Sequence, residues 1–140
     1  MPGQSGHCEN HTNWRTTMKL MTKEIAKKLI YNDLRDTACG ATGDEIVVKY
    51  FNPVGAATWF IVSGTPLNED GEADYETDSP ADWHLFGFCD LGWAGCEELG
   101  YVLLSELENV KLPWGMGIER DLAFKGSLAE VQASYNSRAA

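Results

Sequence analysis

The stretch "EIVVKYFNPVGAATWFIV", residues 45–62, decides the fold. Both of its ends are rich in β-branched and aromatic residues, which are typical of strands. Between them stands "NPVG", with Pro53 at the second position of a tight turn and Gly55 at the fourth. The stretch therefore predicts a β-hairpin with strands at residues 45–51 and 56–62.

A helix is predicted on the N-terminal side of this hairpin. Thr22 is a suitable N-cap, and apolar residues then recur at helical spacing at Ile25, Ala26, Leu29, Ile30 and Leu34. The glycines of "DTACGATGD", residues 36–44, predict that the helix ends before Asp36. Residues 1–17 show no hydrophobic period and are expected to form a disordered extension ahead of a single domain at residues 18–140.

The chain after the hairpin alternates between strand and helix patterns. "DWHLFGFCD" at 82–90 and "ELGYVLL" at 98–104 read as strands, and "GIERDLAF" at 117–124 alternates with Ile118, Leu122 and Phe124 on its apolar side. "SELE" at 105–108 and "SLAE" at 127–130 have capping-box spacing, so each predicts a helix start. We therefore expect an α+β fold: a mainly antiparallel sheet of about five strands, with an N-terminal helix, a short helix after strand four and a C-terminal helix.

Several of these segments resemble one bacterial family. "ELGY", "LSELE" and "IERDL" are the most specific of them, and "MKLMTKEIAKKL" and "VVKYFNPVGAATWFIV" extend the likeness over about residues 18–134. Together they resemble the family catalogued as domain of unknown function 2958, small proteins of plasmids, phages and other mobile elements. The resemblance implies a fold and a genomic setting, and it implies no catalytic residue.

The negative charge of the chain is concentrated in one region. The net charge is −10, and no lysine or arginine occurs between Lys49 and Lys111, where twelve of the acidic residues lie. Seven carboxylates fall in "NEDGEADYETDSPAD", residues 68–82, which is predicted to be a loop. Direct binding to nucleic acid is not expected, because phosphates are neutralised by clustered lysine and arginine. No apolar run is long enough to span a membrane, and no secretory signal is visible, so we expect a cytoplasmic protein.

The acidic stretch has two interpretations. It is either a solvated loop, or a surface whose carboxylates imitate nucleic-acid phosphates and occupy a basic binding site. We favour the second: a non-catalytic mobile-element protein that inhibits a basic host protein, such as a nucleic-acid-binding component of a defence nuclease. The expected contact residues are Glu69, Asp70, Glu72, Asp74, Glu76, Asp78 and Asp82, with Trp83, Trp93 and Trp114 as a further contact region.

The alternative is a small hydrolase that acts on nucleotides or nucleic acid. In a strand over residues 82–90, Asp82 and His84 share a face, and a carboxylate beside an imidazole is a common acid–base arrangement. Arg120 would be the third residue of this site. For Arg120 itself the sequence favours a structural ion pair across the sheet over an anion-binding role. An accessory role in conjugation or replication is a third possibility.

No metal site and no cofactor are predicted. Two groups of residues contain possible ligands: His7, Cys8 and His11, or Cys89, Cys96 and Glu97. Neither contains the paired Cys-x-x-Cys spacing that indicates zinc. The four cysteines are expected to be free thiols.

Overall fold

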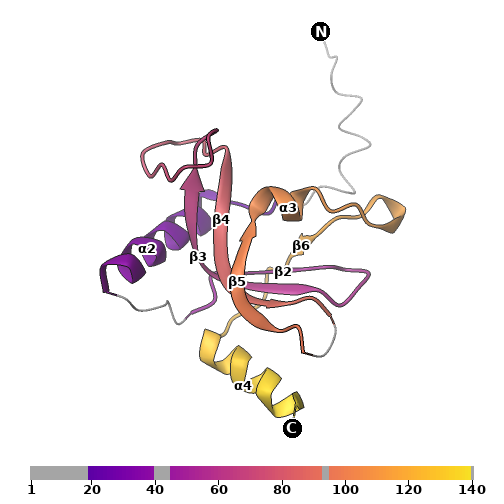
Figure 1. Ribbon diagram of the computed structural model, residues 1–140. Coiled ribbons are helices and arrows are strands. Elements are labelled where there is room, and N and C mark those ends of the chain that lie inside the picture. Colours follow the sequence, from indigo (N-terminus) through magenta and orange to yellow (C-terminus); the bar gives the residue numbers. More distant parts are fainter. Residues whose placement is uncertain (1–18, 40–44, 93–94, 140) are drawn as a thin grey trace.

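A computed structural model describes residues 19–39, 45–92 and 95–139 of the chain. Within these residues five strands form one sheet, in the order β5-β4-β3-β2-β6, with all neighbouring strands antiparallel (Figure 1). The strands are β2 Val48–Phe51, β3 Thr58–Leu67, β4 Asp82–Asp90, β5 Glu98–Leu103 and β6 Glu119–Arg120. The helices are α2 Lys23–Cys39, α3 Leu104–Glu108 and α4 Leu128–Ala139, with a 3₁₀ turn, η1, at Pro113–Gly115.

The predicted α+β fold class is therefore confirmed, including the three helices and their places in the chain. The extension predicted for residues 1–17 lies outside the described residues. No described helix combines the length and the apolar character that a membrane crossing requires.

The hairpin between β2 and β3 forms at the predicted turn. The amide of Gly55 donates to the carbonyl of Asn52 at 3.3 Å, which closes the four-residue turn around Pro53. β3 runs on to Leu67, beyond the predicted end at Val62, because it stays paired with β4 as far as Leu67 opposite Asp82. Pro66 is tolerated in this extension because β2 pairs only with residues 58–61, so no β2 carbonyl requires the amide that proline lacks.

Helix α2 begins at the predicted cap. The amide of Ile25 donates to the Thr22 hydroxyl at 3.2 Å. The predicted end before Asp36 is wrong, because the helix continues to Cys39 and no glycine or proline occurs before Gly40. The sequence pattern predicts Leu34 on the apolar face, but this residue is 48% exposed.

The last strand is shorter than its sequence pattern suggests. β6 contains only Glu119 and Arg120, which pair with Phe51 and Tyr50 of β2. Ile118 is buried as predicted, whereas Leu122 is 72% exposed and not on an apolar face. The alternation fails because the strand has ended before Leu122, and the chain turns there towards α4.

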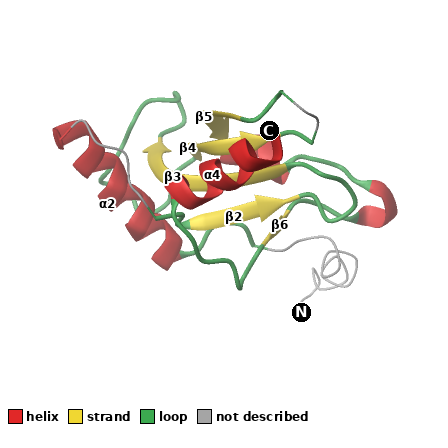
Figure 2. Cartoon of the chain, turned by 90° about the horizontal axis from the view of Figure 1, so that it is seen from below, coloured by secondary structure: helices red, strands yellow, loops and turns green. Residues whose placement is uncertain are grey.

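The sheet has an apolar cluster on each face. Helices α2 and α3 cover one face, where cluster one contains Leu29, Tyr50, Trp83 and Leu107. Helix α4 lies across the other face (Figure 2), where cluster two contains Phe60, Phe88 and Val131. The capping box predicted at Ser127 and Glu130 starts α4, with reciprocal bonds of 2.9 and 3.1 Å. The sheet is thus the middle layer of three.

Candidate functional site

The acidic loop, residues 68–81, connects β3 to β4 and projects from one end of the sheet (Figure 1). It is a loop, as predicted, although its last predicted residue, Asp82, belongs to β4. Five of its six carboxylate side chains are exposed and Asp74 is half-buried. The exposed ones belong to Glu69, Asp70, Glu72, Glu76 and Asp78. The loop therefore presents a surface of one sign of charge to the solvent.

Hydrogen bonds within the loop fix its shape. The side-chain oxygen of Asn68 accepts the amides of Asp70 and Glu72 at 2.9 and 3.0 Å. Gly71 adopts φ = 82°, a left-handed conformation that favours glycine. Further along, the amide of Asp74 donates to the carbonyl of Pro66 at 2.8 Å, beside a bridge between Leu67 and Ala73. The carboxylates are thus carried by an ordered backbone.

Tyr75 ties the acidic loop to helix α2. Its hydroxyl donates to the carboxylate of Asp33, which also accepts the Thr65 hydroxyl at 2.9 Å. Burial and the hydrogen bond to Asp33 raise the pKa of Tyr75. Because the raised pKa favours the neutral phenol in the folded protein, this contact contributes at neutral pH and is lost as the pH rises past the ordinary tyrosine value of 10.0.

Substituting Tyr75→Phe should loosen the acidic loop without unfolding the protein. The change removes one partly exposed hydrogen bond, so the free energy of unfolding should fall by only about 1 kcal/mol. Hydrogen exchange of the amides in residues 68–81 should become several-fold faster, as followed by mass spectrometry. Tyr101→Phe is the matched control, since no hydrogen bond of the Tyr101 hydroxyl occurs among the described residues. Unchanged exchange in Tyr75→Phe would show that the contact does not order the loop.

Asp82 holds helix α3 in place. Its carboxylate accepts the Ser105 hydroxyl at 2.6 Å and the Ser105 amide at 3.0 Å, so it caps the helix from a neighbouring strand. The prediction that Ser105 is itself the N-cap is wrong: Leu103 is the N-cap residue, and its amide donates to Glu106 at 2.9 Å. Burial, and secondarily the nearby Asp82 charge, raise the pKa of Glu108. Asp82 thus has a structural task.

The three residues of the hydrolase alternative are not brought together. The His84 ring stacks on Tyr101, with ring centroids 4.4 Å apart, and no hydrogen bond links it to Asp82 among the described residues. Arg120 lies on β6 at the far edge of the sheet, with β3 and β2 between it and His84. Three strand spacings alone put them at least about 14 Å apart. A site shared by all three residues is therefore not formed, although Asp82 and His84 line one cavity beside the acidic loop.

Arg120 lies next to a buried tyrosine. It pairs in register with Tyr50, whose side chain is fully buried and whose hydroxyl donates to the carbonyl of Leu20 at 2.6 Å. Burial raises the pKa of Tyr50, and the positive charge of Arg120 opposes this shift. The cross-sheet carboxylate partner of Arg120 stays a prediction. An ion pair near this edge joins Lys49 to Asp121 at 3.5 Å.

The three tryptophans proposed as contacts have different environments. Trp83 is only 5% exposed and belongs to cluster one, so it is a core residue and not a surface contact. Its burial follows from strand alternation, which puts it on the opposite face of β4 from Asp82 and His84. Trp93 lies outside the described residues. Trp114 is 80% exposed in η1 and has φ = 61°, which is uncommon for a bulky residue.

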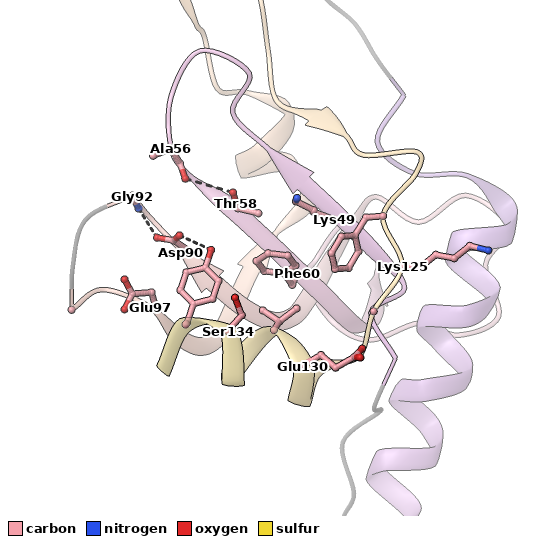
Figure 3. Close-up of a pocket in the computed structure, with 15 residues that line it drawn as sticks. Lys49, Ala56, Thr58, Phe60, Asp90, Gly92, Glu97, Lys125, Glu130 and Ser134 are labelled. Atoms are coloured by element: carbon pink, nitrogen blue, oxygen red, sulfur yellow. Dashed lines mark hydrogen bonds between the residues drawn. The ribbon is translucent and has the colours of Figure 1, made fainter. Parts of the chain in front are cut away.

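A pocket of about 910 Å³ lies between the sheet and α4, away from the acidic loop (Figure 3). Lys49 and Lys125 stand towards one end and Asp90 and Glu97 at the other. The Lys49 ammonium is 5.5 Å from the centroid of the Phe60 ring. Sequence reasoning missed this pocket, because its lining comes from separate parts of the chain that no motif connects.

Of the two groups of possible metal ligands, the structure describes only Cys89, Cys96 and Glu97, and it keeps only the last two of these close together. His7, Cys8 and His11 lie outside the described residues. Cys89 packs against cluster one, where burial raises its pKa to about 11. The donor atoms of Cys96 and Glu97 lie instead within 4.8 Å of Asp90, a residue that the sequence did not indicate.

Comparison with known proteins gives one result. No curated protein and no solved structure matches the chain. A family model, described as protein of unknown function (DUF2958), matches residues 20–139. This range takes in every strand and helix described above. The chain belongs to the DUF2958 family.

Proposed function

We propose that the protein acts without catalysis, by binding a basic partner protein through its acidic loop. A suitable partner for this loop is a host protein with a cationic nucleic-acid-binding surface, such as a component of a defence nuclease. We propose that the two proteins bind each other in the cytoplasm. The family setting implied by the sequence, a mobile element, agrees with such a role. The observation that carries the proposal is an ordered loop with five exposed carboxylates.

The charge of the loop is not compensated locally. No lysine or arginine lies between Lys49 and Lys111, and no ion pair to a loop carboxylate occurs in the described part of the chain. The loop therefore attracts cationic surfaces over about one Debye length, near 10 Å at 0.1 M salt. Such a field accelerates the encounter with a basic partner.

The fixed conformation of the loop favours binding itself, in addition to the electrostatic attraction of the partner. Asn68, Gly71 and Tyr75 hold the backbone in one shape, so less conformational freedom is lost when a partner docks. A solvated loop that served only solubility would need no such contacts. The hydrolase alternative gains no comparable support, because Asp82 is engaged with Ser105 and Arg120 lies across the sheet.

The test compares two variants of equal net charge. Glu69→Gln, Glu72→Gln and Glu76→Gln remove three exposed charges from the loop, and Glu24→Gln, Glu45→Gln and Glu98→Gln remove three exposed charges elsewhere. A partner captured from host lysate at low salt, and released at high salt, supplies the ligand for stopped-flow measurement. We expect the loop variant to associate about tenfold more slowly and the control variant less than twofold.

The salt dependence of association and competition by duplex DNA are two further tests of the proposal. Association of the parent should slow steeply between 0.1 and 1 M salt, where the Debye length falls to about 3 Å, and the loop variant should be less sensitive. Duplex DNA should compete for the partner. Equal slowing in both variants would mean that only the net charge matters, and no slowing in either would refute the proposal.

A further inference from the structure

Three side chains of types that commonly bind metals lie close together at the end of β4 and just before β5. Asp90 is the last residue of β4, and Cys96 and Glu97 directly precede β5. Their donor atoms, two carboxylate oxygens and a thiol sulfur, all lie within 4.8 Å of one another, and the three residues are half-buried. Because adjacent antiparallel strands fix both ends of this connection, the sheet itself brings the three groups together.

The neighbouring candidates are excluded by geometry. Cys89 precedes Asp90 on the strand and points to the opposite face, into cluster one. Glu98 follows Glu97, is exposed, and does not belong to the group of close donor atoms. The group of close donor atoms thus comes from Asp90, Cys96 and Glu97.

Asp90 is held in orientation from two sides. The hydroxyl of Tyr135 in α4 donates to its Oδ2 at 2.7 Å, and the amide of Gly92 donates to its Oδ1 at 2.8 Å. Each oxygen keeps a further lone pair for a cation. Outer hydrogen bonds of this kind orient the ligands of metal sites and are part of their affinity. Tyr135 is itself fixed, because its ring packs edge-on against Phe60 and Phe88.

The surroundings favour a cation. No lysine or arginine forms an ion pair with Asp90 or Glu97 within the described residues. Two carboxylates this close repel each other, and a divalent ion between them would remove that repulsion. Asp90 and Glu97 also line the end of the 910 Å³ pocket in Figure 3, so an ion bound here would be reached by small molecules.

We propose that Asp90, Cys96 and Glu97 bind one divalent transition-metal ion of the Zn²⁺ class. The sulfur ligand selects zinc-like ions over Mg²⁺ and Ca²⁺, which prefer oxygen alone. Binding converts the Cys96 thiol to a thiolate and releases its proton to solvent. Three protein ligands leave a fourth position open to water or a small ligand from the pocket, an arrangement found in reactive rather than purely structural zinc sites. This site is separate from the acidic loop and does not depend on its function.

Titration of the full chain with Co²⁺ tests the site, because a cobalt–thiolate bond gives a near-ultraviolet charge-transfer band. The parent should develop this band with one equivalent of Co²⁺. A variant with Cys8→Ser, Cys39→Ser and Cys89→Ser, which retains Cys96 as its only cysteine, should keep the band. Cys96→Ser should lose it. No band in the parent, or a band that survives in Cys96→Ser, would overturn the proposal.

Three further variants test Glu97 as a ligand and Tyr135 as the residue that orients Asp90. Their affinity for Zn²⁺ is measured by competition against Co²⁺. Glu97→Gln should weaken Zn²⁺ binding at least tenfold, whereas its neighbour Glu98→Gln should stay within twofold. Tyr135→Phe keeps the ring but removes the bond to Asp90, so affinity should fall about tenfold. Equal effects of Glu97→Gln and Glu98→Gln would also overturn the assignment. Melting temperatures measured without metal establish that each variant is folded.

Discussion

The substitution Gly87→Ala should destabilise the protein severely, because it places a methyl group inside the centre of the sheet. A Cβ atom at this position would lie 2.0 Å from the carbonyl oxygen of Phe60 and 2.8 Å from the Cα of Ile61. Both obstructing atoms belong to the backbone of β3, beside a register shift between Ile61 and Ser63. They cannot move unless the strands separate. We expect the free energy of unfolding to fall by about 3 kcal/mol or more, as severe overpacking produces.

Gly100→Ala is the matched control for this result. Gly100 pairs with Gly87 in register on the neighbouring strand, and a Cβ there would meet no atom within 4 Å. Because alanine loses less conformational freedom than glycine on folding, Gly100→Ala should be neutral or stabilising by about 0.5 kcal/mol. Urea unfolding followed by tryptophan fluorescence measures both. Similar stabilities for the two variants would contradict the close approach of β3 and β4.

The second large effect is expected at Trp83. Its side chain is buried in cluster one, beside Leu85 on the same face of β4. Replacing it by alanine should leave a cavity and cost about 3–5 kcal/mol, in the range of large-to-small aromatic substitutions. Thermal unfolding followed by far-ultraviolet circular dichroism measures the loss without relying on tryptophan emission.

Trp114→Ala is the comparison that separates a core role from a contact role. Trp114 is 80% exposed, so the same truncation should change stability by no more than about 0.5 kcal/mol. If Trp83→Ala were as stable as the parent, Trp83 would have to lie on the surface and could again be considered a partner contact. If Trp114→Ala were strongly destabilising, the side chain would have a packing partner.

The features that sequence predicted best are those decided by near neighbours. The turn at Pro53 and Gly55, the cap at Thr22 and the capping box of Ser127 and Glu130 each depend on residues at most four positions apart. Their side chains satisfy backbone groups locally, so the sequence alone identifies them. The order of strands and helices follows from such local signals.

The features that sequence did not predict depend on distant residues. Ser105 resembles an N-cap, but Asp82, 23 positions earlier, provides the oxygen that caps the helix. From the sequence, Trp83 is a plausible interface residue, but the helices on its face of the sheet bury it. The pocket requires α4 to fold back over β3 and β4, and Tyr135 of α4 reaches Asp90 across 45 positions. A local sequence pattern cannot predict a contact between residues so far apart in the chain.

The pairing of β3 with β4 continues to Leu67 and Asp82, the residues that flank the acidic loop. The sheet is therefore complete where the loop begins, and no strand depends on the number of residues between these two positions. Each doubling of such a loop costs only about 0.6 kcal/mol in closure entropy. Insertions and deletions can thus accumulate here while the register of the sheet is inherited unchanged. The length and the charge of this loop can therefore change in evolution independently of the rest of the fold.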